Sequence, residues 1–159
     1  MNIEAALRQG KNILNNKSFK SVNLDCEILM SKALNKDRKY IILNLEKNLE
    51  NYKLDYFKSL VEERSYGKPI AYLIEKKDFW ESEFLIKKGI LIPRPDTEII
   101  VEQALKLNKN RLKQRILDIG VGSGCILLSL LKEKKNFYGI GVDISEKCIS
   151  LSKINAQRL

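Results

Sequence analysis

The residues most able to do chemistry form a glycine-rich turn, Asp118-Ile119-Gly120-Val121-Gly122-Ser123-Gly124, and an acidic residue, Asp143, that follows it in the chain. Glycine adopts positive φ and has no Cβ, so the backbone N–H groups of such a turn can lie close to a ligand. The turn is expected to open a helix, whose free N–H groups would face the same ligand. A carboxylate at the end of the next strand can accept hydrogen bonds from both hydroxyls of a ribose. The pattern predicts a site for a molecule that contains a nucleoside.

Two features distinguish this pattern from a dinucleotide site. The dinucleotide pattern, Gly-x-Gly-x-x-Gly, requires glycine at position 125, where this chain has Cys125. Asp118 lies two residues before the first glycine, where it would repel a pyrophosphate but suits the amino group of a methionine moiety. The spacing therefore favours S-adenosylmethionine as the ligand, and a methyltransferase over a nucleotide oxidoreductase or a purely structural turn. The candidate cofactor-binding residues are Asp118, Gly120, Val121, Gly122, Ser123, Gly124 and Asp143.

Strands that alternate with helices are expected to position this site. Apolar runs predict strands at 116–119 and 137–142, with a helix at 126–131 between them and a last helix from Ser145 to about residue 157. Such alternation is typical of a parallel, doubly wound sheet, which binds ligands at the C-terminal ends of its strands. The sequence therefore predicts an α/β fold with a Rossmann-like domain.

A small helical bundle and a hairpin are expected to precede this domain. Apolar residues recur at helical spacing in four segments, at about 2–16, 24–34, 37–45 and 51–66. Two short strands around a turn, at 78–80 and 84–86, indicate a β-hairpin. We therefore divide the chain into a helical domain (1–68), a hairpin linker (69–93) and the first part of the ligand-binding domain (94–159).

The composition argues against several classes of protein. Hydrophobic residues make up 44% of the 159 residues, as in globular proteins. No apolar run could cross a bilayer and no signal-peptide pattern opens the chain, so we expect a cytoplasmic protein without a membrane-spanning segment. The chain has no histidine and its cysteines lie far apart, which argues against a zinc site, a disulfide framework and a histidine-activated nucleophile. We expect Cys26, Cys125 and Cys148 to be small buried residues.

The net charge of +9 could attract an anionic partner such as RNA. The lysines are nevertheless scattered, and no arginine-rich or aromatic-interleaved stripe occurs. Direct nucleic-acid binding is therefore not favoured.

Three further motifs precede the glycine turn in a fixed order. They are Glu63-Arg64-x-x-Gly67-x-Pro69-x-Ala71-Tyr72, Phe79-Trp80 and Leu91-Ile92-Pro93-Arg94-Pro95-Asp96-Thr97-Glu98. Together with the glycine turn, this series resembles the HemK/PrmC family of protein-(glutamine-N5) methyltransferases. The resemblance runs from the helical segment to Leu159, and Ile-Pro-Arg-Pro-Asp-Thr-Glu is its most specific part.

This resemblance implies a class I methyltransferase domain that binds S-adenosylmethionine. It also implies that the helical domain helps to recognise a peptide chain release factor, whose Gly-Gly-Gln loop presents the glutamine to be methylated. Val121 stands where these enzymes often have threonine, and its backbone is expected to face the cofactor. For Arg94, Asp96 and Glu98 we weigh a ligand contact against a structural role, in which Asp96 or Thr97 caps the next helix and Arg94 pairs with a carboxylate.

Phe79 and Trp80 are expected to anchor the hairpin in the core. The family's catalytic signature, Asn-Pro-Pro-Tyr, is absent, and no Asn-Pro pair occurs in the 159 residues. In the family this motif orients the target amide, whose nitrogen is a poor nucleophile. Without this motif we assign no catalytic residue and expect the 159 residues to be inactive alone. Two strands of a larger sheet would also leave apolar edges open, so we expect a fragment of a longer enzyme.

Two alternatives stay open from the sequence. A DNA or RNA amino-methyltransferase would share the glycine turn, although the helical bundle and the Arg-Pro-Asp-Thr-Glu segment argue against it. A non-catalytic module could also use the bundle to bind a release factor.

Overall fold

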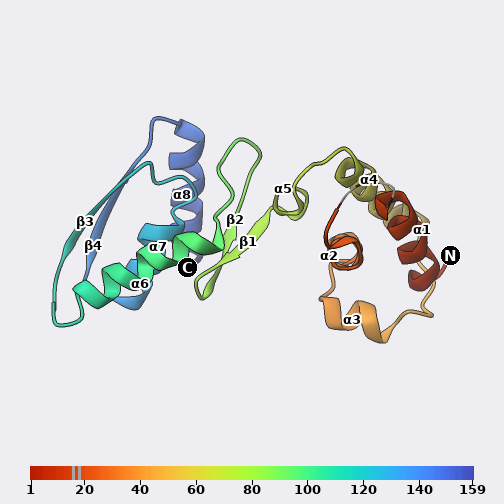
Figure 1. The fold of residues 1–159 in the computed structure, drawn as a ribbon, viewed down its shortest axis with the longest axis horizontal. Coiled ribbons are helices and arrows are strands. Elements are labelled where there is room, and N and C mark those ends of the chain that lie inside the picture. The colour runs from red at the N-terminus through yellow and green to blue at the C-terminus, as the bar shows by residue number, and fades with distance from the viewer. Residues whose placement is uncertain (16, 18) are drawn as a thin grey trace. The chain divides into compact units, whose positions relative to one another are not determined.

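The computed structural model describes residues 1–15, 17 and 19–159, which form two compact units, Met1–Ile74 and Glu75–Leu159 (Figure 1). The first unit consists mainly of helices, and the second combines helices with two pairs of strands. The structure groups residues 70–74 with the helices and the hairpin with the parallel strands. The functional division at residues 68 and 93 stays a prediction.

The helical unit contains the four helices that the apolar spacing predicts and one more. They are α1 (Ile3–Asn15), α2 (Val22–Leu34), α3 (Arg38–Leu43), α4 (Asn51–Ser65) and the short α5 (Ile70–Ile74). Asp37 caps α3, because its side chain accepts a hydrogen bond from the backbone N–H of Tyr40 at 2.7 Å. Asn35 ends α2 in the left-handed conformation, where asparagine is tolerated better than most residues.

Helices α1, α2 and α4 pack around one apolar core in this unit. Gly10, which interrupts the helical pattern of α1, lies in this core. A Cβ at this position would lie 3.0 Å from Cζ of Phe57 on α4. The glycine therefore allows a close approach between α1 and α4, a packing role that the sequence pattern alone did not indicate.

A buried ion pair joins α2 to α4. The side chain of Arg64 donates to Asp25 at 2.9 Å, and both side chains are largely shielded from solvent. Arg64 also donates to the carbonyl of Lys68 at 3.1 Å and stacks on the ring of Phe19, 4.0 Å from its centroid. Ser21 donates a further hydrogen bond to Asp25. Arg64 of the Glu-Arg-x-x-Gly motif thus holds the helical unit together.

The second unit begins with an antiparallel hairpin and continues as a β-α-β-α series. Its elements are β1 (Lys76–Phe79), β2 (Ser82–Leu85), a 3-10 turn (Pro95–Thr97), α6 (Glu98–Leu107), β3 (Arg115–Ile119), α7 (Cys125–Glu133), β4 (Tyr138–Val142) and α8 (Glu146–Arg158). The predicted hairpin, both predicted parallel strands and the helices that follow them are thereby confirmed.

Strands β3 and β4 pair in parallel, and α7 packs on one face of the pair. Gly139 and Gly141 of β4 lie on this face. A Cβ on Gly139 would lie 2.6 Å from Leu127 of α7, and one on Gly141 would lie 2.6 Å from Val121. The two glycines therefore let α7 and the glycine turn lie directly against the strand.

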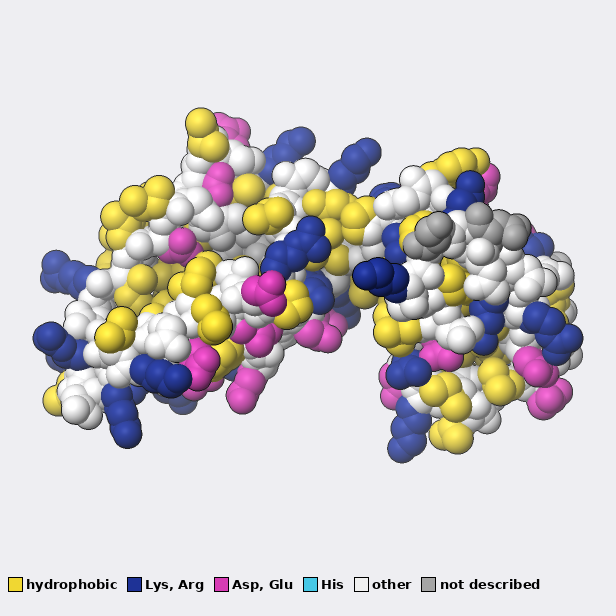
Figure 2. Space-filling model, viewed as in Figure 1, with side chains coloured by type: hydrophobic (Ala, Val, Ile, Leu, Met, Phe, Trp, Pro, Cys, Tyr) yellow, Lys and Arg dark blue, Asp and Glu magenta, His cyan; other side chains and the backbone are white. Residues whose placement is uncertain are grey.

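The opposite face of the strand pair is apolar and exposed. Figure 2 shows apolar side chains gathered over these strands at the left of the view. The exposed residues on this face include Leu117, Ile119, Ile140 and Val142, and Ile119 is 79% exposed. Paired residues of adjacent strands point to the same side, so these four side chains form one apolar strip.

Polar contacts hold the turn of the hairpin on α6 and α7. Trp80 has a positive φ of 52°, and its backbone N–H donates to Glu98 of α6 at 2.9 Å. Its indole N–H donates to Glu133 of α7 at 2.8 Å, and Lys132 donates to Ser82 at 2.8 Å. The hairpin is therefore an integral part of the second unit.

Two expectations about buried side chains need correction. Phe79 is buried and packs edge-to-face on Phe84, as expected, but Trp80 is only half-buried. Cys26 and Cys148 are buried, whereas Cys125 is half-buried because it opens α7 at the edge of the glycine turn. Burial raises the pKa of Cys26 to about 11, which keeps its thiol protonated.

None of the helices in the described residues has both the length and the apolar character needed to cross a membrane.

Candidate functional site

The glycine turn leaves the C-terminal end of β3 and leads into α7. Gly120, Gly122 and Gly124 have φ values of 84°, 56° and 85°, a region that other residues rarely adopt. The N–H groups of Gly120 and Val121 donate to the carbonyl of Val142 at 2.8 and 3.0 Å. The turn is thereby fixed to the end of β4, and its conformation depends on its glycines.

The space in front of Gly120 is open. A Cβ built on Gly120 would have no atom within 4 Å, and one on Gly122 would meet only the carbonyl oxygen of Gly120, at 3.9 Å. In contrast, Val121 and Ser123 direct their side chains into the protein, where both are buried. The turn thus presents backbone to this open space, as a cradle for a ligand requires.

Asp143 connects the end of β4 to the glycine turn. Its carboxylate accepts a hydrogen bond from the N–H of Gly122 at 2.9 Å and another from the N–H of Ser145 at 2.9 Å. The Ser145 and Gly122 N–H groups lower the pKa of this carboxyl, so it stays charged at neutral pH. Each carboxylate oxygen keeps a further lone pair, which can accept a hydrogen bond from a ligand hydroxyl.

Asp118 lies across the turn from Asp143 and has the opposite pKa shift. Burial raises its pKa, the backbone N–H of Leu127 in α7 partly offsets this, and the nearby charge of Asp143 raises it further. The two carboxylates therefore make the site negative, which suits a cationic group such as an ammonium or a sulfonium. An anion placed directly beside them would be repelled.

Helix α7 begins directly after the turn. Gly124 precedes its first residue, Cys125, and the carbonyl of Gly124 accepts the N–H of Leu128 at 2.9 Å. The first N–H groups of a helix have no partner within the helix and carry partial positive charge. The site therefore combines two carboxylates with a helix N-terminus, which can bind both charged ends of an amino acid.

The structure brings the seven predicted residues together at the C-terminal ends of β3 and β4. The other candidates behave differently. Glu98 holds the hairpin by accepting from Trp80, whereas neither Asp96 nor Thr97 caps α6 through its side chain. Arg94 is exposed and forms no ion pair within the described residues. Of the structural roles weighed for these residues, the described part of the chain shows neither the side-chain cap nor the ion pair of Arg94, and Glu98 instead accepts a hydrogen bond from Trp80.

Asn155 is a site residue that the sequence reasoning missed. It lies on α8, is fully buried and donates a hydrogen bond to the carbonyl of Ser123 at 2.9 Å. It shares the buried face of α8 with Cys148 and Leu151, at helical spacing. An asparagine on an otherwise apolar helix face is a signal that could have identified it.

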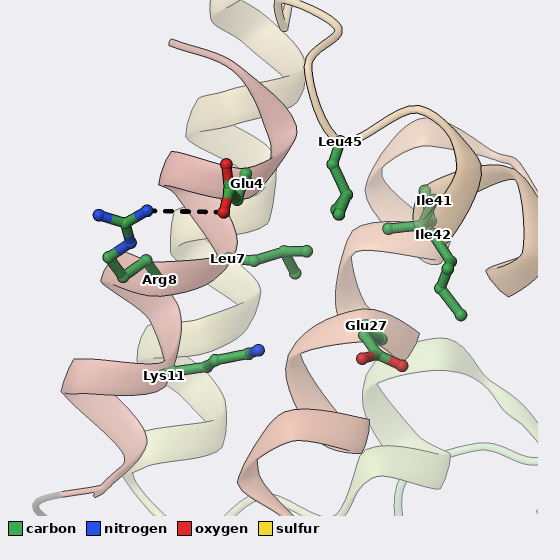
Figure 3. A pocket seen from close by; sticks show the side chains of 8 residues that line it. All are labelled: Glu4, Leu7, Arg8, Lys11, Glu27, Ile41, Ile42 and Leu45. Atoms are coloured by element: carbon green, nitrogen blue, oxygen red, sulfur yellow. Dashed lines mark ion pairs between the residues drawn. The ribbon is translucent and has the colours of Figure 1, made fainter.

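A hollow of about 370 Å³ lies in the helical unit, between α1, α2 and α3 (Figure 3). Its lining is apolar in the centre and charged at the rim, and consists of Glu4, Leu7, Arg8, Lys11, Glu27, Ile41, Ile42 and Leu45. Glu4 and Arg8 form an ion pair at 3.6 Å on one side. Such a mixture of apolar floor and charged rim is typical of a surface that binds protein.

Comparison with known proteins identifies relatives of both units. Residues 5–74 match the family model of the PrmC N-terminal domain. The chain is 43% identical over 143 residues to the release factor glutamine methyltransferase of Buchnera aphidicola subsp. Baizongia pistaciae, covering 90% of this chain and 52% of the relative. It is 37% identical over 159 residues to the enzyme of that name from Clostridium acetobutylicum, covering 100% of this chain and 56% of the relative.

A bifunctional methyltransferase of Rickettsia felis is 32% identical over 181 residues, covering 97% of this chain and 34% of the relative. The chain spans about half the length of the release factor glutamine methyltransferases that it matches. These similarities extend over both structural units. They confirm the resemblance seen in the motifs: this chain is related to the release factor glutamine methyltransferases of the HemK/PrmC family.

Proposed function

We propose that these residues form the donor-binding half of an enzyme that uses S-adenosylmethionine to methylate the glutamine side chain in the Gly-Gly-Gln loop of release factors. The hydrogen bond from Gly122 to Asp143 carries this proposal, since it joins the glycine turn to the acid at the end of the next strand. The similarity to release factor glutamine methyltransferases supports the substrate class.

In this proposal the second unit is the beginning of a Rossmann-like class I methyltransferase domain. The parallel β3–α7–β4 unit supports it, because ligands of such sheets bind at the C-terminal ends of the strands. The exposed apolar face of the strand pair would then be covered by parts of the protein outside these 159 residues.

Each group of the proposed site has a distinct task. Asp143 accepts the ribose hydroxyls, Asp118 attracts the amino group, and the N-terminus of α7 binds the carboxylate of the methionine moiety. The glycines of the turn keep the backbone free of side chains at the ligand. The donor supplies a methyl group on a sulfonium, which a nucleophile displaces directly.

The acceptor nitrogen needs more help than this site provides. The lone pair of an amide nitrogen is delocalised, so the nitrogen must be oriented precisely towards the methyl group. No Asn-Pro pair occurs in the 159 residues, and we assign the orientation of the amide to residues outside them. The residues described here hold the donor and help to bind the release factor.

We assign release-factor binding to the helical unit, at the hollow between α1, α2 and α3. Ile42 lines this hollow and is 48% exposed, so a partner could bury it without rearrangement of the core. We expect Ile42→Lys to raise the KM for the release factor about tenfold, because it places a charge in an apolar contact. The KM for S-adenosylmethionine should not change.

Methyl transfer to a release factor tests the proposed function. The full natural protein is incubated with radiolabelled S-adenosylmethionine and a release factor, and mass spectrometry locates the methyl group. A release factor with Gln→Ala in its Gly-Gly-Gln loop is the matched acceptor control. We expect label in the native release factor only.

The donor site is tested in the same assay with Asp143→Ala. This variant removes the acceptor of the Gly122 and Ser145 hydrogen bonds and should abolish measurable transfer. Label in DNA or RNA but not in the release factor would replace this proposal with a nucleic-acid amino-methyltransferase. Release-factor binding without any donor binding would instead support a non-catalytic module.

A further inference from the structure

Asn155 is the polar side chain most completely enclosed in the second unit. It is 0% exposed and lies on the face of α8 that also buries Cys148 and Leu151. Burial of an amide without hydrogen bonds is costly, so this position needs partners to be tolerated. Its partners connect two segments that are far apart in the sequence.

One of these segments is strand β2 of the hairpin. The Asn155 side-chain oxygen accepts from the N–H of Leu85 at 2.8 Å, and its NH₂ group donates to the carbonyl of Leu85 at 3.1 Å. The amide thus pairs with both backbone groups of Leu85, as a residue of a neighbouring strand would. Helix α8 and β2 are therefore fixed to each other at this residue.

The other segment is the glycine turn. The same NH₂ group donates to the carbonyl of Ser123 at 2.9 Å. The N–H on the other side of that peptide bond, from Gly124, donates to the carbonyl of Val121 at 2.7 Å. Because both ends of this planar unit are held, its orientation is fixed.

The held peptide bond sets the direction in which α7 begins. Gly124 has a φ of 85° and directly precedes the first residue of α7. A rotation of the Ser123–Gly124 peptide would reorient both the turn and the free N–H groups at the start of the helix. The hydrogen bond from Asn155 opposes this rotation without contributing any atom to the open space in front of Gly120.

We infer that Asn155 is a positioning residue for the donor site: it holds the glycine turn in its binding conformation through Ser123 and couples it to the hairpin through Leu85. This inference rests on the proposed function, since it assumes that the turn binds S-adenosylmethionine. Asn155 is shielded from the donor and acts only through the backbone that it orients.

The decisive variant is Asn155→Asp. Aspartate has the same shape and can still accept from Leu85, but it presents a carboxylate oxygen to the carbonyls of Leu85 and Ser123 in place of a donor. Leu151→Ala is the control, because Leu151 is buried one turn away on α8 and packs in the apolar core with Ile90 and Cys148. The free energy of unfolding is measured for both, so that donor binding is compared between variants of known stability.

The dissociation constant for S-adenosylmethionine is measured on the full natural protein by titration calorimetry. We expect Asn155→Asp to raise it at least tenfold and to raise the KM for the donor but not for the release factor. In the amide NMR spectrum without donor, the signals of Gly122 and Gly124 should shift in Asn155→Asp. Leu151→Ala should bind within about twofold of the native protein and leave these signals in place.

Equal affinity of Asn155→Asp and the native protein would overturn the inference and leave the proposed function intact. If the native protein itself binds no donor, the proposed function fails. Should Asn155→Asp not fold, Asn155→Ser replaces it, because serine is too short for the three hydrogen bonds and adds no charge. A Ser variant that binds as tightly as Leu151→Ala would count against the inference in the same way.

Discussion

Two carboxylates of the same type have opposite electrostatic environments in the glycine-turn site. Asp143 is stabilised as an anion by two backbone N–H groups, whereas burial and the charge of Asp143 disfavour the anion of Asp118. The folded state therefore binds the proton of Asp118 more tightly than the unfolded chain does. Stability is consequently lost as pH rises through the raised pKa of Asp118, so its charge is a cost to folding at neutral pH.

We expect Asp118→Asn to weaken donor binding without lowering the stability of the second unit. The neutral amide removes the unfavourable charge, so the free energy of unfolding at neutral pH should stay constant or rise. Loss of a charged hydrogen bond to the donor amino group costs about 1.5–3 kcal/mol, so the dissociation constant should rise by about ten- to hundredfold. Calorimetric titration and urea unfolding at neutral pH measure the two quantities.

Asp55→Asn is the control for the change in net charge, because Asp55 is an exposed residue of α4 in the other unit. It should alter neither the donor affinity nor the stability of the second unit. A large loss of stability in Asp118→Asn, with unchanged donor binding, would show that Asp118 is a structural residue.

For single residues, the sequence predicted which of them lie together at the glycine turn but not which hydrogen bonds they form. Glycine spacing and the strand-end position of Asp143 were sufficient to identify the turn. The hydrogen bond between Gly122 and Asp143 depends on the register of two strands, which local sequence does not define. The role of Asn155 was missed for the same reason, because its partners are 32 and 70 residues away in the chain.

Close packing of α7 on β4 depends on two glycines with different neighbours. A Cβ on Gly141 would clash with Val121, which is β-branched and part of the glycine turn. A Cβ on Gly139 would meet the flexible side chains of Leu127 and Leu131, which belong to α7 and not to the glycine turn. Equal substitutions should therefore have unequal effects on the donor site.

We expect Gly141→Ala to displace Val121, destabilise the second unit by about 1–3 kcal/mol and weaken donor binding. Gly139→Ala should destabilise the unit by no more than this and leave the donor affinity nearly unchanged. Urea unfolding and donor titration of the two variants give the comparison. If the two variants bind the donor equally well, displacement of Val121 does not disturb the part of the turn that binds the donor.

In the helical unit, the buried ion pair between Asp25 and Arg64 joins α2 to α4. Arg64→Met leaves the carboxylate of Asp25 buried without its charge partner and should destabilise this unit by about 3–5 kcal/mol. The double variant Asp25→Leu/Arg64→Met removes both charges and should be more stable than Arg64→Met alone. Thermal unfolding followed by circular dichroism checks the order, and a double variant less stable than the single one would contradict it.

Elements with regular periodicity were predictable, and their ends and junctions were not. The four apolar helical patterns and the alternation of strands with helices gave the correct elements, because burial of one face dominates local preference. Helix α5 was missed because five residues are too few to show a period. The anchoring of the hairpin by Glu98, Lys132 and Glu133 depends on contacts between distant segments, which no local pattern reveals.

At the scale of the molecule, each unit has its own apolar core, and the second unit also leaves an apolar strip exposed on its strand pair. We expect the isolated 159-residue polypeptide to self-associate through the exposed strip on β3 and β4. The paired substitutions Leu117→Lys and Ile140→Lys should reduce association without loss of stability, because both side chains are already exposed. Sedimentation velocity at several concentrations measures the effect.

Ile99→Lys together with Ile100→Lys is a matched control, since these residues are also exposed but lie on α6. If association persists in the β3–β4 variant but disappears in the α6 variant, the surface that mediates self-association lies on α6. A polypeptide that stays monomeric without any substitution would contradict the prediction for the strand face.

The hydrogen bond between the indole of Trp80 and Glu133 gives this protein a built-in optical reporter. The chain has one tryptophan, and it lies in the second unit, on the turn that joins the hairpin to α6 and α7. Its fluorescence therefore reports on the second unit, in which the proposed donor site lies. Release of the hairpin would move the indole from a half-buried contact into water, so a red shift in emission would mark the separation of the hairpin from α6 and α7.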